Sequence, residues 1–477
     1  MQLKTITIIC IICMIVFNHG QSNGQTNYYS KALNQYSFDL YDKTKVENEN
    51  ILLSPISTYY ALLMIYKGSK KETEKEFKKV LYLRKSNSQQ SNYLQNLISK
   101  SDSLAPLIIS NSIWIDKKFK IKKRYLKVVT DKYLTELNHT DFSKTESAVY
   151  DINKWVSDNT KGKIKKIVNT DNLNSNTKLL ISNAVYFKSE WQNKFKKGKT
   201  TPAIFYTDTK NQFKLDFMNT TENLKYYEND DYQFISKPYK DSDFSFCIIL
   251  PKKLFGIGKI EKKINNKTLN NILENTSSTK ISLSIPKFEM ESSYDLSDAL
   301  EHDGLKSAFK ENADFSEISG KSSLKLSKVL HKTWIQFDEE GTEAAAATAT
   351  VGMVTGLRPT NLFFKADHPF IFFVTDNKSG AIILMGRYVI PTDGEQIEKE
   401  KLSENMINRK TEIFKTKNLQ KKVLFLLDKK IISQSEFKTI DPKKIESINV
   451  YKDKKEVAKY STGNYDGVVV ITLKKNQ

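Results

Sequence analysis

Few side chains in this 477-residue sequence could catalyse a reaction. It has five histidines and three cysteines, and no two histidines stand at the spacing of metal ligands. HExxH, GxSxG and GxxxxGK[ST] motifs are absent, and Gly256-Ile257-Gly258 lacks the third glycine of a dinucleotide loop. A lone histidine among apolar residues, as at His331, is typical of a hydrogen-bonded core residue. We therefore expect no enzymatic activity, no metal ion and no cofactor.

The most unusual segment combines small residues with strand-like alternation. Alanine propensity alone would favour a helix over Ala344–Ala347. In a strand, alternate residues share a face, and on one face this segment would then carry only small uncharged side chains, at Thr342, Ala344, Ala346, Thr348 and Thr350. Such a segment could slide between existing strands without burying a charge. We interpret it as an exposed loop that can become a central strand.

Composition indicates a folded body behind an export signal. Hydrophobic residues make up 39% of the chain and aromatic residues 11%, which excludes a mainly disordered protein. Residues 1–24 combine Lys4, an apolar stretch and small residues before Gln25, as in a secretory signal peptide. Beyond them, no stretch approaches the roughly 20 apolar residues of a membrane span. We expect a secreted or extracytoplasmic protein.

Cysteine usage fits that reading. Cys10 and Cys13 lie inside the apolar leader. A lipid anchor at Cys13 stays open, although Ile12, which is not small, precedes it. Removal of the leader would leave only Cys247, so we expect no intramolecular disulfide.

The net charge of +20 is spread along most of the chain among interleaved acids, which favours a solvated surface over a nucleic-acid site. The densest basic run, Lys117–Lys127, also contains aromatic and aliphatic residues. It could be an exposed turn and helix start or a basic patch. We expect no nucleic-acid partner.

Apolar spacing predicts helices first and strands later. The N-terminal half gives a helix over 28–43, a strand over 50–53, a helix capped by Ser57, an irregular polar stretch over 85–95, a strand over 107–115, a helix over 148–159 and a buried strand over 178–187. From residue 205 onward, β-branched and aromatic runs dominate, at 213–217, 232–235, 244–250, 280–285, 361–364, 370–375 and 381–390. This order predicts an α+β domain with large sheets.

Taken together, motifs spread over 28–391 resemble the serpin family. The carrying motifs, in chain order, are Asn50–Ser57, Ile152–Val156 with Thr160–Ile164, Ser182–Lys188 with Trp191 and Phe195, Ile285–Phe288, Ala313–Ser316, His331-Lys332, the segment around Gly341, Asp367–Phe370 and Met385–Arg387. The resemblance implies a serpin domain over 25–391 with three β-sheets, eight or nine helices and an exposed reactive loop.

By that resemblance the protein is a suicide substrate. A target protease, a serine or cysteine endopeptidase, would cleave the loop, form an acyl-enzyme and be trapped as the loop inserts into the main sheet, a strand-addition event known for serpins. The alternative is a non-inhibitory serpin fold that serves as a binding or surface scaffold.

The resemblance also assigns roles to residues. The hinge that inserts first comprises Glu340, Gly341, Thr342, Glu343, Ala344, Ala345, Ala346, Ala347 and Thr348. The breach, where insertion begins, comprises Trp191, Lys287 and Glu339. The shutter, a buried polar cluster that rearranges as the sheet opens, comprises Ser54, Ser57, Asn183 and His331.

The scissile bond depends on how the loop is counted. Counting from Gly341 gives Thr355-Gly356, whereas counting back from His368-Pro369 shifts the choice toward Gly356 to Arg358. Thr355 or Met353 suits an elastase-like or subtilisin-like protease and Arg358 a trypsin-like one, which Pro359 disfavours. We favour Thr355.

A polar linker over 392–417 should lead to a small separate α/β module over 418–477. Strands are expected at 423–427, 445–451 and 467–473. Residues 423–475 resemble part of the plug of TonB-dependent outer-membrane receptors, on the motifs Leu424–Asp428, Ile440–Lys452 and Asn464–Thr472. That resemblance implies a Gram-negative source and an envelope protein as partner.

Overall fold

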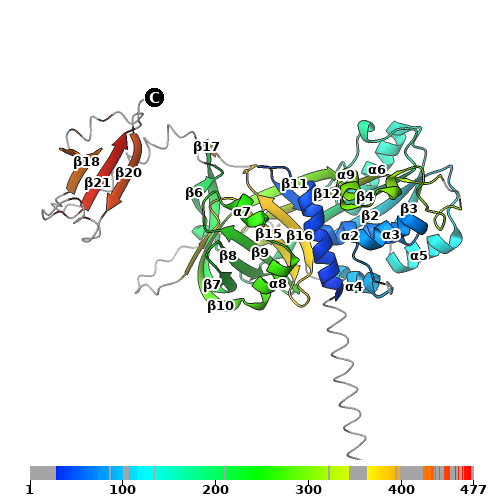
Figure 1. Ribbon diagram of the computed structural model, residues 1–477, viewed down its shortest axis with the longest axis horizontal. Coiled ribbons are helices and arrows are strands. Elements are labelled where there is room, and N and C mark those ends of the chain that lie inside the picture. Colours follow the sequence, from blue (N-terminus) through cyan, green and yellow to red (C-terminus); the bar gives the residue numbers. More distant parts are fainter. Residues whose placement is uncertain are drawn as a thin grey trace, which may run out of the picture. The chain divides into compact units, whose positions relative to one another are not determined.

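The computed structural model describes most of the chain (Figure 1). The described residues are 28–84, 88–99, 107–133, 135–208, 211–320, 323–342, 362–392, 395–397, 423–428, 430–433, 445–451, 467–473 and the single residues 436, 440, 457, 460 and 465. The expected signal peptide, 1–24, and most of the expected linker lie outside them. Two compact units emerge, one of 1–207 with 213–394 and one of 208–212 with 395–477.

The main sheet of the first unit has five strands in the order β11-β12-β4-β2-β3. Their bounds are Leu107–Asp116 (β2), Glu136–Thr140 (β3), Leu179–Phe187 (β4), Phe288–Asp295 (β11) and Leu326–Phe337 (β12). The central neighbours β4 and β12 run parallel and pair directly, from Leu326 opposite Leu179 to Trp334 opposite Tyr186. All nine residues of β4 are buried, as its uninterrupted apolar run predicts.

A second sheet is built from the later part of the chain, in the order β1-β16-β15-β9-β8-β7-β10-β14, with β6 beside β7. Its strands are Ile51–Leu53 (β1), Thr201–Tyr206 (β6), Gln212–Glu228 (β7), Tyr232–Pro238 (β8), Phe244–Pro251 (β9), Ser277–Pro286 (β10), Leu362–Lys365 (β14), Phe370–Asp376 (β15) and Ile382–Tyr388 (β16). A two-stranded ladder joins β5 (Ser189–Glu190) to β13 (Gly341–Thr342). Among the described residues, the first unit thus has the three sheets that the resemblance implies.

Nine α-helices are present in the described residues of this unit, in agreement with the expected eight or nine. They are 28–44, Pro55–Tyr66 (α2), Lys71–Val80 (α3), Ser88–Ser99 (α4), Lys123–Tyr133 (α5), Thr145–Asn159 (α6), Ile257–Glu261 (α7), Asn266–Glu274 (α8) and Ser297–Asp303 (α9). No helix in the described ranges is both long and apolar enough to cross a membrane. The α+β class is confirmed.

Helix α2 is buried along its whole length, against β4 and β16. A helix that is buried on every side lies inside a domain, and Figure 1 shows α2 beside α3. The helix begins at Pro55, directly after Ser54. Ser57 therefore sits in its first turn, and the expectation that Ser57 caps the helix was wrong.

The stretch expected to be irregular, 85–95, is also a correction, because α4 runs from Ser88 to Ser99. Its apolar residues come late, with Leu94 and Leu97 buried one turn apart. The polar first half, which includes the buried Gln90, carries no apolar period and so hid the helix from the pattern.

An aromatic cluster fills the core where the two large sheets meet. The indole of Trp191 stacks on Tyr239, with ring centroids 4.8 Å apart and an interplanar angle of 7°. It also stacks on Phe337 at the end of β12, at 6.2 Å and 19°. Phe246 packs on Phe337 at 4.4 Å. This cluster fixes the end of β12, from which the loop departs.

The second unit contains a sheet in the order β19-β18-β21-β20. Its strands are Val423–Leu427 (β18), Lys430–Ile432 (β19), Ile445–Tyr451 (β20) and Gly467–Leu473 (β21), so the three expected strands are confirmed and a fourth is added. Buried residues lie on both faces, with Leu424 and Val468 in one cluster and Phe425 and Ile471 in another. These residues form the β part of the expected module. A short strand, Glu395–Ile397 (β17), falls inside the span expected to be linker.

Candidate functional site

The chain reverses direction directly after β12. The carboxylate of Asp338 accepts hydrogen bonds from the backbone N–H groups of Glu340 (2.9 Å) and Gly341 (3.1 Å), and the Asp338 N–H donates to the Gly341 carbonyl (2.9 Å). Gly341 has φ +154°, and a Cβ there would lie 2.1 Å from the carbonyl oxygen of Ser189. The reversal therefore requires glycine at position 341.

After the reversal, the first hinge residues form a short ladder outside the main sheet. Strand β13 pairs antiparallel with β5, Gly341 opposite Glu190 and Thr342 opposite Ser189. Strand β5 follows directly on β4 in the chain. The hinge thus starts on the strand that continues β4, while β4 and β12 stay paired with each other.

The rest of the predicted loop lies outside the described residues. This applies to the hinge residues Glu343, Ala344, Ala345, Ala346, Ala347 and Thr348 and to the candidate scissile residues Met353, Thr355, Gly356 and Arg358.

The three breach residues come together at the reversal. Trp191 is fully buried, its indole Nε1–H donates to the Asp338 carbonyl (2.9 Å), and its backbone N–H donates to the Glu340 carbonyl (3.0 Å). Lys287, which follows β10, forms a 3.0 Å ion pair with Glu339, whose side chain is 7% exposed. The structure thus places Trp191 and the Lys287–Glu339 pair at the same chain reversal.

The breach has partners that the sequence did not indicate. The hydroxyl of Thr200 donates to the Glu339 carboxylate (2.7 Å), and Lys194 pairs with Glu340 (2.8 Å). Burial alone would raise the pKa of Glu339, but the hydrogen bonds from Thr200 and Lys287 outweigh it and lower the pKa. Glu339 is therefore ionised at neutral pH. In the sequence, Thr200 and Lys194 stand among other polar residues, as surface residues do, so no pattern indicated that they contact the breach.

The shutter residues form one buried hydrogen-bonded cluster beneath β4 and β12. Ser54, Ser57, Asn183 and His331 are all fully buried. The Asn183 amide donates to Ser57 and its carbonyl oxygen contacts His331 Nδ1. Asn183 and His331 also stand opposite each other in the β4–β12 pairing. All four predicted residues are brought together.

The hydrogen bonds define the state of His331. Its Nε2 accepts from the Ser54 backbone N–H (3.0 Å), so the proton sits on Nδ1 and faces the Asn183 carbonyl oxygen. Burial lowers the pKa of His331 to about 3. The ring is therefore neutral and fully hydrogen-bonded, and charging it would cost free energy in the folded state.

Two further shutter members were missed. Thr333 lies 2.8 Å from His331 Nε2, and Asn111, on β2, accepts from the Asn183 amide and from the Ser57 hydroxyl (3.4 Å). An asparagine in the middle of the buried strand 107–115 was the signal that could have found Asn111, since buried polar groups need partners.

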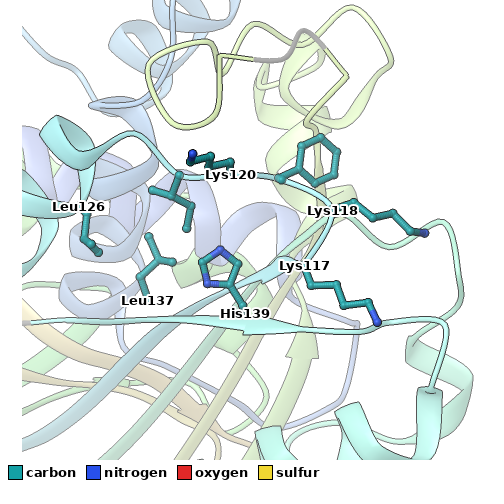
Figure 2. A pocket seen from close by; sticks show the side chains of 8 residues that line it. Lys117, Lys118, Lys120, Leu126, Leu137 and His139 are labelled. Atoms are coloured by element: carbon teal, nitrogen blue, oxygen red, sulfur yellow. The ribbon is translucent and has the colours of Figure 1, made fainter.

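The basic run Lys117–Lys127 forms the turn between β2 and α5 and the start of that helix. A hollow of about 470 Å³ lies against it, lined by four lysine and histidine side chains and four apolar ones, Lys117, Lys118, Phe119, Lys120, Ile121, Leu126, Leu137 and His139. Figure 2 shows Lys120 pointing away from Lys117 and Lys118. Lys117 is already paired with Asp141 (2.6 Å). The cations do not converge, which favours the exposed-turn interpretation.

Comparison with known proteins agrees with this architecture. The model of the family described as Serpin (serine protease inhibitor) matches residues 31–391. The chain is 38% identical to a serpin-like protein of Thermococcus kodakarensis, over 78% of this chain and 88% of that protein. It is 35% identical to the leukocyte elastase inhibitor of Xenopus laevis, over 76% and 99%. The crystal structure of the thermophilic serpin tengpin in its native state superposes with a TM-score of 0.70 at 32% identity, over 76% and 94%. The chain belongs to the serpin family.

Proposed function

We propose that this serpin is an exported, irreversible inhibitor of serine or cysteine endopeptidases. The observation that carries the proposal is the pairing of β13 with β5 while β4 and β12 remain closed. The loop thus starts beside the end of the β4–β12 pair, between whose strands it would insert, and that pair is still closed. Relatives with inhibitor names, among them the leukocyte elastase inhibitor of Xenopus laevis, support the same activity.

The pairing register supports insertion along β4. Gly341 opposite Glu190 and Thr342 opposite Ser189 set a register that, if continued antiparallel, brings Ala346 opposite Val185 and Thr348 opposite Asn183. The inserted loop would then run antiparallel to both β4 and β12. Antiparallel pairs are slightly more stable per residue than the parallel pair they would replace, and a complete extra ladder is gained. Insertion is therefore favourable once cleavage frees the loop.

The same register explains why the small residues matter. Thr348 would arrive at Asn183, which is bonded to His331 and Ser57 in the closed sheet. A threonine hydroxyl can donate and accept, so it could replace hydrogen bonds that the opening sheet breaks. An alanine or threonine needs little space, whereas an arginine would bring an unpaired charge into the sheet.

The proposed scissile bond is Thr355-Gly356, which suits an elastase-like or subtilisin-like protease. The test is incubation of the purified protein with pancreatic elastase and with subtilisin, followed by denaturing electrophoresis and mass spectrometry. We expect a denaturant-stable complex and a released C-terminal fragment that begins at Gly356. The matched control is Ala346→Arg, which should be cleaved at the same bond without forming a complex. Cleavage of the wild-type loop that yields only free fragments would sink the inhibitor proposal.

A second candidate function rests on the C-terminal unit. Its four-stranded sheet has buried residues on both faces, so it is a folded unit and could carry a task of its own. We propose, from its resemblance to a TonB receptor plug, that it docks an envelope protein of a Gram-negative cell. Deletion of 394–477 separates the two functions, since inhibition should survive the deletion whereas a scaffold would lose its partner.

A further inference from the structure

Lys237 and Glu222 form a buried ion pair that contacts segment 191–195, the segment whose backbone is hydrogen-bonded to the chain reversal after β12. Lys237, on β8, has a side chain only 1% exposed, and Glu222, on β7, is 10% exposed. Lys237 Nζ lies 2.5 Å from the Glu222 carboxylate. Two charges removed from water are costly unless they are well placed and fully hydrogen-bonded, so such a pair is weak support for stability and invites another explanation.

Both members of the pair hold the same residue. Lys237 Nζ donates to the backbone carbonyl of Asn193 (2.8 Å). The Asn193 amide donates to the second carboxylate oxygen of Glu222 (3.0 Å). Asn193 is therefore fixed through its main chain by one charge and through its side chain by the other. Bonds to charged groups are about twice as strong as neutral ones.

Asn193 lies between the two residues that hold the reversal after β12. The backbone N–H of Trp191 donates to the Glu340 carbonyl (3.0 Å), and that of Phe195 donates to the Glu339 carbonyl (2.9 Å). Lys237 Nζ also lies over both rings, 5.4 Å from the Trp191 centroid and 4.7 Å from that of Phe195. A cation at such distances is attracted to the ring faces. Segment 191–195 is thus held by the Lys237–Glu222 pair through Asn193, and it holds residues 339–340 through the backbone N–H groups of Trp191 and Phe195.

We infer that the Lys237–Glu222 pair is a positioning pair that holds segment 191–195, and through it the chain reversal at 338–341, in the uninserted state. It acts on the reversal through Asn193, Trp191 and Phe195. The inference rests on the proposed inhibitor function, in which this reversal has to open when the loop inserts. Removing the pair should loosen the breach before any cleavage.

The test variant is Lys237→Met with Glu222→Leu, which removes both charges and leaves neither unpaired. Amide hydrogen exchange is measured at Trp191 and Phe195, the two donors to the reversal. We expect exchange there to accelerate about tenfold, the change that follows from losing one or two net hydrogen bonds. Uptake of a synthetic peptide with the sequence of residues 342–354 should accelerate in the same variant, because the peptide needs the same breach to open.

The matched control is Lys252→Met with Glu228→Leu. That pair has the same chemistry at 2.7 Å, is about one third exposed, and Glu228 lies on the same strand as Glu222. Exchange at Trp191 and Phe195 should be unchanged in it. If exchange at both amides and peptide uptake keep their wild-type rates in the test variant as well, the pair does no more than balance the cost of its own burial. That result would overturn the inference.

If the double variant does not fold, Asn193→Ala removes only the bond to Glu222 and should accelerate the same two amides by a smaller factor. No acceleration in a folded Asn193→Ala protein would then overturn the inference. Neither readout uses a protease. If the protein forms no complex with any protease, the proposed function is refuted, but amide exchange still tests whether the Lys237–Glu222 pair holds segment 191–195.

Discussion

The breach and the shutter lie along the same seam between β4 and β12 but are built from different chemistry. The breach is held by charges at the margin of the sheet, where Lys287 is 37% exposed and its partner Glu339 is nearly buried. The shutter is neutral and buried, with Asn183 and His331 fully buried and hydrogen-bonded. Charges near water can separate and be solvated at modest cost. In a buried neutral cluster, every hydrogen bond that is broken has to be replaced by another, because a buried polar group without a partner is costly. From this difference we predict that the seam opens first at the breach and is held closed longest at the shutter.

The largest expected effect lies at the centre of the shutter. Asn183→Ala leaves His331, Ser57 and Asn111 with lost partners and opens a small cavity, so we expect a loss of about 3 kcal/mol in the free energy of unfolding. Chemical denaturation measures it. The control is Asn176→Ala, at an exposed position, which should change stability by less than about 0.5 kcal/mol. Equal losses in the two variants would break the contrast between buried and marginal polar groups.

The next effect is pH dependence. Unfolded His331 gains its proton near pH 6.5, whereas the folded residue stays neutral to about pH 3. The unfolded state therefore binds more protons between these values, and this residue's contribution falls as the pH falls, by about 1.4 kcal/mol per pH unit. At pH 5 the loss is about 2 kcal/mol.

Denaturation curves at pH 7 and pH 5 test this prediction. In His331→Gln, the drop in stability between the two should shrink by about 2 kcal/mol. The control His302→Gln removes an exposed histidine and should leave the drop unchanged. If His331→Gln shows the full wild-type drop, the shutter histidine is not held neutral as described.

The smallest effect is expected at the breach. Lys287→Met removes the ion pair to Glu339 but leaves the hydrogen bond from Thr200, so we expect about 1 kcal/mol of lost stability. The control Lys378→Met breaks a more exposed pair with Asp243 and should cost about 0–0.5 kcal/mol. The same variants should differ more in peptide uptake, which Lys287→Met should accelerate. A larger loss of stability than at Asn183 would reverse the comparison.

Local patterns predicted those strands in which burial is a property of contiguous residues, whereas β11 and β12 of the main sheet were not predicted. The run at 178–187 became β4, and three strands of the C-terminal module, β18, β20 and β21, lie where the sequence predicted them. Helix α4 was missed, since its polar first half faces partners contributed by other elements, as where Tyr29 contacts Gln89. No pattern within one segment contains that information.

The site could be predicted only in part. Resemblance brought Trp191, Lys287 and Glu339 together across the chain, which spacing alone could not do. The burial of Lys237, which follows the predicted run 232–235, could not be predicted from the sequence, because it depends on contacts with Glu222 and with the rings of Trp191 and Phe195. Charges buried by tertiary contact leave no periodic signal.

The central claim is that the loop after Thr342 can become a strand between β4 and β12. The most direct test is the thermal unfolding temperature of the purified protein before and after a protease cuts once within 343–361. An inserted strand adds a ladder on each side and completes the sheet, so the account predicts a large rise in unfolding temperature, absent in Ala346→Arg. An unchanged or lower unfolding temperature in the cleaved wild-type protein would contradict it.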